Sequence, residues 1–495
     1  MPKTELIRRV SSDIVAGDHP YLRGAWTPLH EEVNATGLEL IEGRIPTDID
    51  GVYLRNTQNP VYQSLGRYHP FDGDGMIHML SLRDGQAQYR NRFVDTKGLR
   101  AEQEAGHRLW AGLMEDPTLS ARPGWGAHGG IKDASSTDVV VHAGHALTAY
   151  YQCGEGYRMD PFTLEQQGIP PWSPLDGISA HMKVDEHSGE LLFFNYSKHA
   201  PYMHYGVVDR HDQLVHYVPV PLPGPRLPHD MAFSERYAIL NDFPLFWDPA
   251  LLKDRKHVVK FHRDMPSRFA IIPRRGQGAD IRWFEAAPTF VLHFLNAYEE
   301  GDEIVLDGYF QDEPEPRNFD GAPAGYERMM SYLDQYKMGT HLHRWRFNLR
   351  TGATTEQRLD DRILEFGMIN QRHGGRPYRY AYSAVQVPGW FLFHGYVKHD
   401  LHTGQSWPIQ LPAGQYASEA PFAPRIGARD EDDGYLVTFI TDEEAQRSEA
   451  VLIDCKRFAE GPVCRIALPH KLCSGTHSCW AAGADIREGL LRSPK

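Results

Sequence analysis

The sequence predicts an all-β protein whose short strands close into a β-propeller. Short apolar or alternating runs recur along the 495 residues, and clusters of Gly, Pro, Asp and Asn separate them. One turn pattern also recurs, in which an Asp or Asn is followed four residues later by a Gly, at residues 185–189, 348–352 and 400–404. Similar hairpins repeated along a chain are typical of a strand meander, and a propeller is its natural closed form.

Strands are expected where aliphatic, aromatic and β-branched residues run together. In chain order these segments are residues 139–141, 191–194, 237–240, 269–272, 390–393 and 435–440. No linker or low-complexity tract interrupts the pattern, so residues 1–495 are expected to form a single domain.

Helical segments are expected to be few. A helix over residues 101–114 would place Leu109, Trp110, Leu113 and Met114 on one face, and residues 245–252 are unusually apolar. Ordinary core packing explains both segments. The alternative is an apolar rim, formed by residues 105–114 and 245–252, that contacts a membrane or a lipid-like substrate.

Composition excludes several functional classes. A net charge of −13 without a basic stripe argues against nucleic acid as a partner and against adhesion to anionic lipid. Five cysteines without a C-x-x-C pair support neither a disulfide framework nor a zinc–thiolate site, and they fit a reducing cytoplasm. The N-terminus lacks the apolar core of a signal peptide, and no apolar run approaches the roughly 18 residues that span a bilayer.

Four histidines within distinctive apolar phrases are the candidate metal ligands. Most of the 26 histidines are expected to be surface or hydrogen-bonded core residues, and the surrounding phrases single these four out. Neutral imidazole is the commonest metal ligand and suits Fe, Zn, Cu and Ni. Because the four are scattered along the chain, only a closed fold could gather them. They are His181, His229, His293 and His477.

The segment Phe-Asp-Gly-Asp-Gly-Met at residues 71–76 is a second informative motif. An EF-hand loop that started at Asp72 would need Glu at its twelfth position, where this chain has Arg83. A calcium loop is therefore rejected, and a tight Gly-rich turn between strands is the structural alternative.

Several phrases together resemble the carotenoid cleavage oxygenase family. They cover nearly the whole chain, from about residue 38 to 480, and lie at residues 51–60, 71–76, 281–285, 296–299, 431–436 and 475–480. The resemblance implies a seven-bladed β-propeller, with loops and short helices capping its top face. It also implies one non-haem Fe(II) per chain, held by the four histidines named above. His470 lies near the last phrase, but the Gly-x-His-x-x-Trp context selects His477.

The resemblance also implies glutamates that orient the ligand histidines. Such carboxylates accept the free ring N–H and so fix the tautomer. Glu365 and Glu419 match two of them, and an exposed carboxylate is the alternative at each position. At the third position the chain departs from the family pattern, because the expected Glu falls on Tyr151 or Gln152. We expect no carboxylate on the remaining histidine there, unless Glu155 is recruited.

The activity implied by the resemblance is oxidative cleavage of a conjugated C=C bond by O₂, giving two carbonyl products. No catalytic residue beyond the iron site is expected; Thr137, Tyr150, Tyr151 and Gln152 are expected beside it. Stilbene-cleaving members carry a Lys where this chain has Tyr150, so an apolar carotenoid or apocarotenoid is the expected substrate. Stilbene cleavage and a non-catalytic scaffold remain alternatives. The expected compartment is the cytoplasm, with the segments 105–114 and 245–252 as candidates for peripheral membrane contact.

Overall fold

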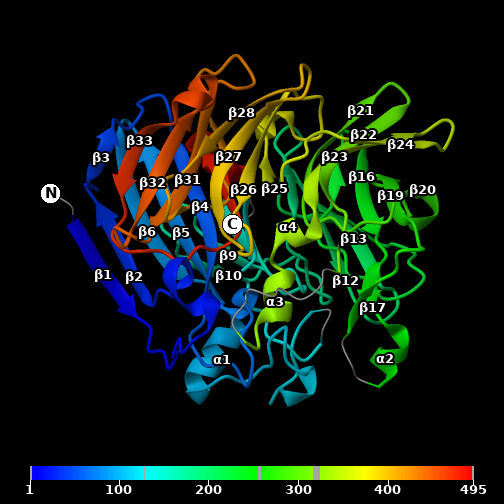
Figure 1. The fold of residues 1–495 in the computed structure, drawn as a ribbon, viewed down its shortest axis with the longest axis horizontal. Coiled ribbons are helices and arrows are strands. Elements are labelled where there is room, and N and C mark those ends of the chain that lie inside the picture. The colour runs from blue at the N-terminus through cyan, green and yellow to red at the C-terminus, as the bar shows by residue number, and fades with distance from the viewer. Residues whose placement is uncertain (1–2, 127–128, 255–257, 316–323, 493–495) are drawn as a thin grey trace. The chain divides into compact units, whose positions relative to one another are not determined.

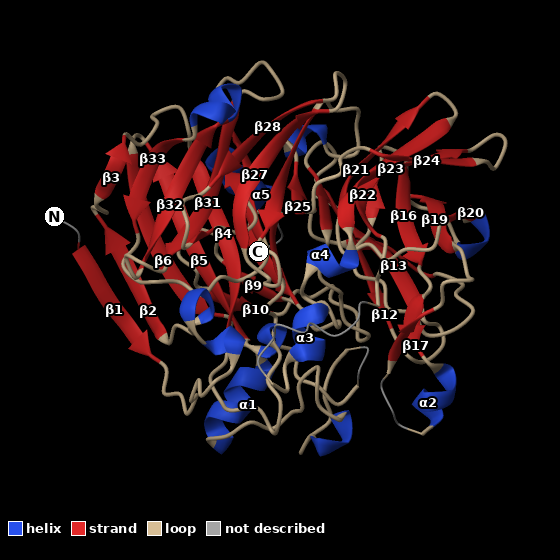
Figure 2. Cartoon of the chain, in the orientation of Figure 1, coloured by secondary structure: helices blue, strands red, loops and turns tan. Residues whose placement is uncertain are grey.

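The computed structural model describes residues 3–126, 129–254, 258–315 and 324–492. Within them, seven antiparallel sheets of four to six strands form the blades of a seven-bladed β-propeller, as predicted (Figure 1). Strands dominate and helices are short (Figure 2). The chain divides into two compact units. Unit 1 comprises residues 1–180, 210–212 and 407–495, and unit 2 comprises residues 181–209 and 213–406. That the whole chain is one domain stays a prediction.

Unit 1 contains three of the sheets. The first has the strand order β1 (Lys3–Arg9), β2 (Glu31–Thr36), β6 (Gln86–Phe93), β5 (Asp74–Arg83), β4 (Gly51–Asn59) and β34 (Ser478–Ala482). The second has the order β10 (Gln166–Gly168), β9 (Tyr157–Met159), β8 (His145–Ala149) and β7 (Asp138–His142). The third has the order β29 (Gln415–Tyr416), β31 (Gly434–Asp442), β32 (Arg447–Asp454), β33 (Pro462–Ala467) and β3 (Leu40–Gly43), and β30 (Phe422–Pro424) pairs with β31.

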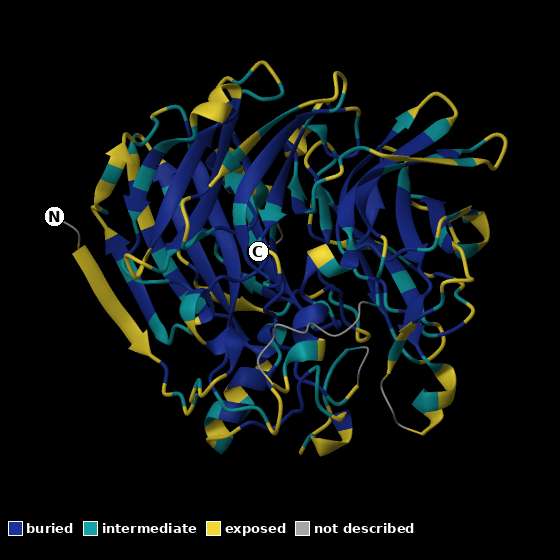
Figure 3. Cartoon of the chain, viewed as in Figure 1, coloured by how far each residue is buried: buried dark blue, intermediate teal, exposed yellow. Residues whose placement is uncertain are grey.

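Two sheets of unit 1 therefore mix strands from opposite ends of the chain. β34 pairs with β4, and β3 pairs with β33. Aliphatic and aromatic side chains of these two sheets pack into one core, which includes Tyr53, Leu80, Tyr89, Phe439 and Leu452. Burial of this apolar surface, at about 25 cal/mol per Å², joins strands that are distant in sequence. Figure 3 shows the contrast between these buried inner strands and β1, which is exposed along its length.

Unit 2 contains the other four sheets, whose strands pair in chain order; only the end of the last strand, residues 407–410, is assigned to unit 1. The first sheet has the order β11 (Lys183–Asp185), β12 (Glu190–Tyr196), β13 (Met203–Val208) and β14 (Leu214–Pro219), and the second has the order β15 (Ala232–Phe233), β16 (Tyr237–Asp242), β19 (Ser267–Pro273) and β20 (Arg282–Ala286). The third has the order β21 (Phe294–Glu300), β22 (Glu303–Gln311), β23 (Thr340–Asn348) and β24 (Thr354–Arg358). The fourth has the order β25 (Leu364–Met368), β26 (Tyr380–Gln386), β27 (Phe393–Asp400) and β28 (Gln405–Gln410). A separate hairpin pairs β17 (Leu245–Trp247) with β18 (Val259–Phe261).

The predicted strands are confirmed at five of six segments, and residues 390–393 are wrong. That run lies mostly in the turn before β27, because Pro388 and Gly389 break the extended backbone. Gly389 adopts a positive φ of 80°, and the backbone N–H of Val387 donates to the carbonyl of Leu392 at 2.7 Å. The hydrophobicity of the run reflects burial of Phe391 and Leu392, not strand pairing.

The recurring turn is confirmed at all three positions. Asp185, Asn348 and Asp400 each accept backbone N–H groups two residues on through the side chain. The closing glycines have φ values of 72°, 79° and 74°. A non-glycine residue is strained at such a φ, which explains the fixed position of Gly in the pattern.

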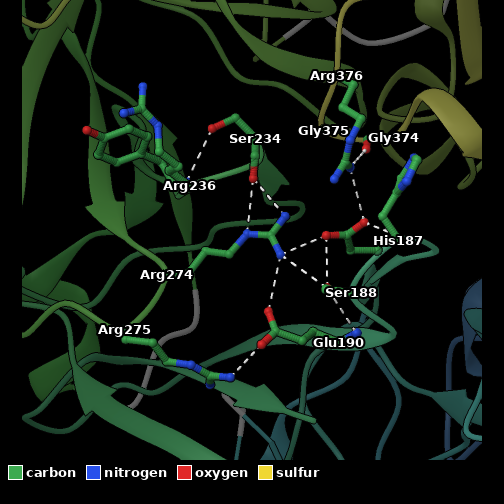
Figure 4. A network of polar contacts seen from close by, with 12 residues as sticks. His187, Ser188, Glu190, Ser234, Arg236, Arg274, Arg275, Gly374, Gly375 and Arg376 are labelled. Carbon is green, nitrogen blue, oxygen red and sulfur yellow. Dashed lines mark hydrogen bonds and ion pairs between the residues drawn. The ribbon is translucent and has the colours of Figure 1, made fainter. Parts of the chain in front are cut away.

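The turn at Asp185 also anchors a network between sheets of unit 2 (Figure 4). The Arg274 guanidinium donates to the carboxylates of Asp185 at 2.8 Å and Glu190 at 3.2 Å, and to the carbonyl of Ser234. Arg376 approaches the other oxygen of Asp185 at 3.4 Å. These contacts link the β11 and β15 sheets to the segment that joins β25 to β26.

The helix expected over residues 101–114 is shifted and shorter. The observed α1 is Lys97–Ala105, capped at its start by the Thr96 hydroxyl and ended by Gly106 at a φ of 74°. Leu109 and Trp110 follow in irregular backbone and are buried. The other helices are α2 (Pro249–Lys253), α3 (Glu327–Ser331), α4 (Gln335–Met338) and α5 (Gly483–Arg492).

The two apolar segments are partly core. Leu245, Phe246 and Trp247 are buried, and α2 continues the second segment with only partial exposure of its leucines. The candidate membrane contact is limited to the apolar side chains of these segments that are at least partly exposed, namely Ala105, Leu113, Met114, Pro249, Ala250, Leu251 and Leu252. Among the described helices, none is both long and apolar enough to cross a bilayer.

The Phe-Asp-Gly-Asp-Gly-Met segment has a structural role in unit 1. Asp74 begins β5, and its carboxylate lies 2.6 Å from the ammonium of Lys132, which also binds Glu102 at 2.7 Å. All three side chains are at most 2% exposed. Asp72 accepts the backbone N–H of Leu113 at 3.0 Å. The glycine at position 75 is needed because a Cβ there would lie 2.4 Å from the carbonyl oxygen of Ser135.

Candidate metal site

Three of the four candidate histidines come together in unit 2. Ligand nitrogens of His181, His229 and His293 all lie within 4.8 Å of one another. Each residue comes just before the first strand of a sheet: His181 before β11, His229 before β15 and His293 before β21. Histidines placed alike in consecutive sheets can thus converge, although they lie 48 and 64 residues apart in sequence.

His181 has a strained backbone conformation. His181 has a φ of 64°, in the left-handed region that costs a non-glycine residue of order 1 kcal/mol or more. Its Nε2 lies 3.1 Å from Nε2 of His229. Two ligands bound to one metal at a right angle, with bonds of ~2.1 Å, would have nitrogens about 3.0 Å apart. The spacing of this pair therefore fits a shared divalent metal.

Glu365 fixes the orientation of His293. Its Oε2 lies 2.6 Å from Nδ1 of the ring, and the same carboxylate accepts the backbone N–H of Phe366 at 2.5 Å. A carboxylate only accepts hydrogen bonds, so the ring proton is assigned to Nδ1 and the lone pair to Nε2. Phe366 stacks on the imidazole at 5.2 Å between ring centroids, and Phe391 and Phe393 pack against Phe366.

His477 and Glu419 form a similar pair in unit 1. Nδ1 of His477 lies 3.2 Å from Oε1 of Glu419, whose other oxygen accepts the backbone N–H of Ser478 at 2.5 Å. His477 immediately precedes β34, which is an edge strand of its sheet. The three histidines of unit 2 likewise precede edge strands, namely β11, β15 and β21. Burial raises the pKa of Glu419, and the neighbouring His477 opposes that shift.

The other residues expected near the site are described within unit 1. Tyr150 is buried in an apolar cluster with Ala111, Ile131 and Ala134, and burial raises its pKa well above the ordinary value. The Thr137 hydroxyl accepts the backbone N–H of Tyr151 at 3.2 Å. Burial also raises the pKa of Tyr151, and the Gln152 side chain donates to its hydroxyl.

Glu155 is engaged elsewhere in unit 1. Its carboxylate lies 2.6 Å from the Lys97 ammonium and 3.1 Å from the Tyr157 hydroxyl. That Glu155 does not replace the missing glutamate stays a prediction.

Sequence reasoning missed Asp230, which follows His229 directly. Its side chain is fully buried and forms an ion pair with Lys183 at 2.7 Å. Burial raises the pKa of the carboxyl to about 6, and the Lys183 ammonium opposes this shift. Two signals were available in the sequence. Asp230 directly follows the candidate ligand His229, and Lys183 lies two residues after the candidate ligand His181.

The donor set fits a resident divalent metal. The clustered side chains are imidazoles, and the tautomer set by Glu365 leaves the outward nitrogen of His293 as a lone-pair donor. Outer carboxylates of this kind are the usual companions of metal-bound histidines.

We expect Glu365→Gln to weaken metal binding by roughly 10–100-fold, because the amide is a weaker acceptor and no longer enforces one tautomer. Metal affinity measured by chelator competition checks this. Glu356→Gln is the matched control, since Glu356 contacts His343, a histidine outside the cluster, at 3.3 Å. Equal affinities in the two variants would contradict the role assigned to Glu365.

Comparison with known proteins shows which proteins this chain is similar to. The family model described as retinal pigment epithelial membrane protein matches residues 26–482. A carotenoid 9,10(9',10')-cleavage dioxygenase 1 from Phaseolus vulgaris is 30% identical, over 95% of this chain and 91% of that protein. An isoeugenol monooxygenase from Pseudomonas putida is also 30% identical, over 93% and 98%.

A similar fold is found among solved structures. The crystal structure of the lignostilbene dioxygenase of Pseudomonas brassicacearum has a TM-score of 0.81 and 27% identity. The match covers 95% of this chain and 100% of that one.

Proposed function

Because the chain belongs to the retinal pigment epithelial membrane protein family, which includes the carotenoid cleavage oxygenases, we propose that it is a non-haem Fe(II) dioxygenase. Its proposed reaction cleaves a conjugated C=C bond of a carotenoid or apocarotenoid with O₂ and gives two carbonyl products. The observation that carries this proposal is the convergence of His181, His229 and His293.

Iron is the proposed metal, and His477 the proposed fourth ligand. Imidazole nitrogens suit Fe, Zn, Cu and Ni alike, and the oxygenase names of the relatives favour iron among these. Bound Fe(II) would supply the redox centre at which O₂ reacts. His477 is included because its Nδ1 faces Glu419 as that of His293 faces Glu365.

The protein side chains would supply orientation and an apolar environment. Glu365 holds the proton of His293 on Nδ1. Phe366, Phe391 and Phe393 form an aromatic group on one side of that ring, and Phe290 lies 6.5 Å from His229 between ring centroids. Such surroundings favour a conjugated apolar substrate and exclude water. The cleavage needs no general acid or base from the protein.

A polyene is preferred over a stilbene because of Tyr150. A phenolic substrate needs a polar anchor, and leaving its hydroxyl unpaired in a buried site would cost roughly 1–3 kcal/mol. Tyr150 occupies the position at which stilbene-cleaving members of the family carry a Lys. Its side chain is buried among apolar residues. Cleavage of a phenylpropanoid or stilbene is the second candidate, favoured by the likeness to isoeugenol monooxygenase at equal identity.

A substrate panel tests the proposal. Protein loaded anaerobically with Fe(II) is expected to consume O₂ with apocarotenals and to yield two carbonyl products of complementary mass. Turnover of resveratrol-like stilbenes and of isoeugenol is expected to be at least tenfold slower. Faster turnover of a phenolic substrate would favour the second candidate. Absence of bound iron would favour a non-catalytic scaffold.

The cytoplasm is the proposed compartment. All five cysteines are free thiols, as expected where disulfides are kept reduced. The proposed partners are O₂ and an apolar substrate.

A further inference from the structure

The Asp230 carboxylate contacts all three chain segments that carry the clustered histidines. Oδ1 lies 2.7 Å from the ammonium of Lys183. Oδ2 accepts the backbone N–H of Phe294 at 2.8 Å. The backbone N–H of Met231 donates to Oδ1 at 2.7 Å. One side chain thus joins the starts of β11, β15 and β21, which open three consecutive sheets.

Each contact falls one or two residues from a candidate ligand. Lys183 comes two residues after His181, Asp230 one residue after His229, and Phe294 one residue after His293. Consecutive Cα atoms are held about 3.8 Å apart, so fixing these groups also fixes the neighbouring histidines. No ladder between the sheets contributes here, because the three strands belong to separate sheets.

The environment of Asp230 makes these contacts strong and directional. Its side chain is fully buried, whereas Lys183 is 25% exposed. A buried carboxylate must be paired and hydrogen-bonded to be tolerated, so it holds its partners in place. The backbone carbonyl of Asp230 also accepts Nδ2 of Asn241 at 2.7 Å, which ties the residue to β16.

We propose that Asp230 is a positioning residue that sets the spacing of the three imidazoles by binding Lys183 and the backbone of Phe294. The proposal rests on the metal site proposed above. Asp230 does not itself contact the imidazole nitrogens in this assignment. It acts through the backbone, in contrast to Glu365, which acts on a ring directly.

Cobalt(II) binding tests this role, because its affinity and absorption spectrum report ligand geometry without turnover. Asp230→Asn keeps the size of the side chain but removes the charge that attracts Lys183. We expect its dissociation constant for Co²⁺ to rise about tenfold, at the lower end of outer-ligand effects, with shifted absorption bands. Lys183→Met should raise the constant several-fold, and Lys183→Arg should recover most of the affinity because it keeps the charge.

Asp307→Asn is the matched control. The Asp307 carboxylate is likewise fully buried and ion-paired, at 2.7 Å to Arg344, but it binds none of the three histidine segments. It should lower thermal stability and leave Co²⁺ affinity and spectrum unchanged.

The outcomes separate the two proposals. If wild-type protein binds Co²⁺, and Asp230→Asn and Lys183→Met bind it with the same affinity and spectrum, the positioning role is overturned and the metal site stands. If wild-type protein does not bind Co²⁺ or Fe²⁺, the metal site fails and the positioning role fails with it. Should Asp230→Asn not fold, the Lys183 pair of variants decides.

Discussion

Replacing His293 with Ala is expected to abolish iron binding and oxygenase activity together. The substitution removes an imidazole whose proton is held by Glu365 and which lies in the cluster with His181 and His229. Two remaining imidazoles of unit 2 would hold a divalent ion weakly and in the wrong place. We expect a loss of activity of at least a thousandfold, and an iron content near zero after gel filtration.

The control for this variant is His343→Ala. His343 has the same 8% exposure as His293 and also contacts a glutamate, Glu356, but it lies outside the cluster. It should keep its iron and its activity. Retention of stoichiometric iron by His293→Ala, measured by metal analysis, would refute the assignment.

The largest effect on stability is expected from Lys132→Met. The side chain of Lys132 is 1% exposed, and its ammonium forms ion pairs with the buried carboxylates of Asp74 and Glu102. Without the ammonium, the Asp74 and Glu102 carboxylates lose their shared positive partner, although Arg108 remains 3.7 Å from Glu102. Breaking a buried ion pair in this way typically costs about 3–5 kcal/mol. The denaturant concentration at the midpoint of unfolding is expected to fall, and an equilibrium unfolding curve measures it.

Lys456→Met provides the comparison. Lys456 lies at the same 2.6 Å from Asp430, but this pair is on the surface. Solvent and salt screen such pairs, so the midpoint should hardly change. Equal midpoints for the two variants would show that the buried network is not needed for stability.

Strands and turns were predictable because their signals are local. Alternation and β-branched residues identified β7, β12, β16, β19 and β31, and the Asp-to-Gly spacing identified three turns. The errors were local as well. Gly106 ends α1 before the apolar residues that were assigned to it, and the Pro388-Gly389 turn replaces an expected strand. In both places a backbone constraint outweighs the hydrophobic pattern.

The choice of the candidate histidines depended on the phrases around them and on the family resemblance. Nothing in the local sequence indicates that His181, His229 and His293 converge, because their proximity depends on where three sheets begin. Glu365 lies 72 residues from the histidine that it contacts. Asp230 was missed because its partners, one ammonium and two backbone N–H groups, form no known motif, although its position directly after His229 was a signal.

The pairing of β4 with β34 affects how the protein is made. Residues 51–59 leave the ribosome more than 400 residues before residues 478–482, their partners in the sheet. At about 5–20 residues per second, that interval lasts roughly 20–80 s. In each sheet of unit 2 the strands pair in the order in which they emerge. During this interval the edge of β4 that later receives β34 is exposed on the nascent chain, a period in which a chaperone would protect it from aggregation.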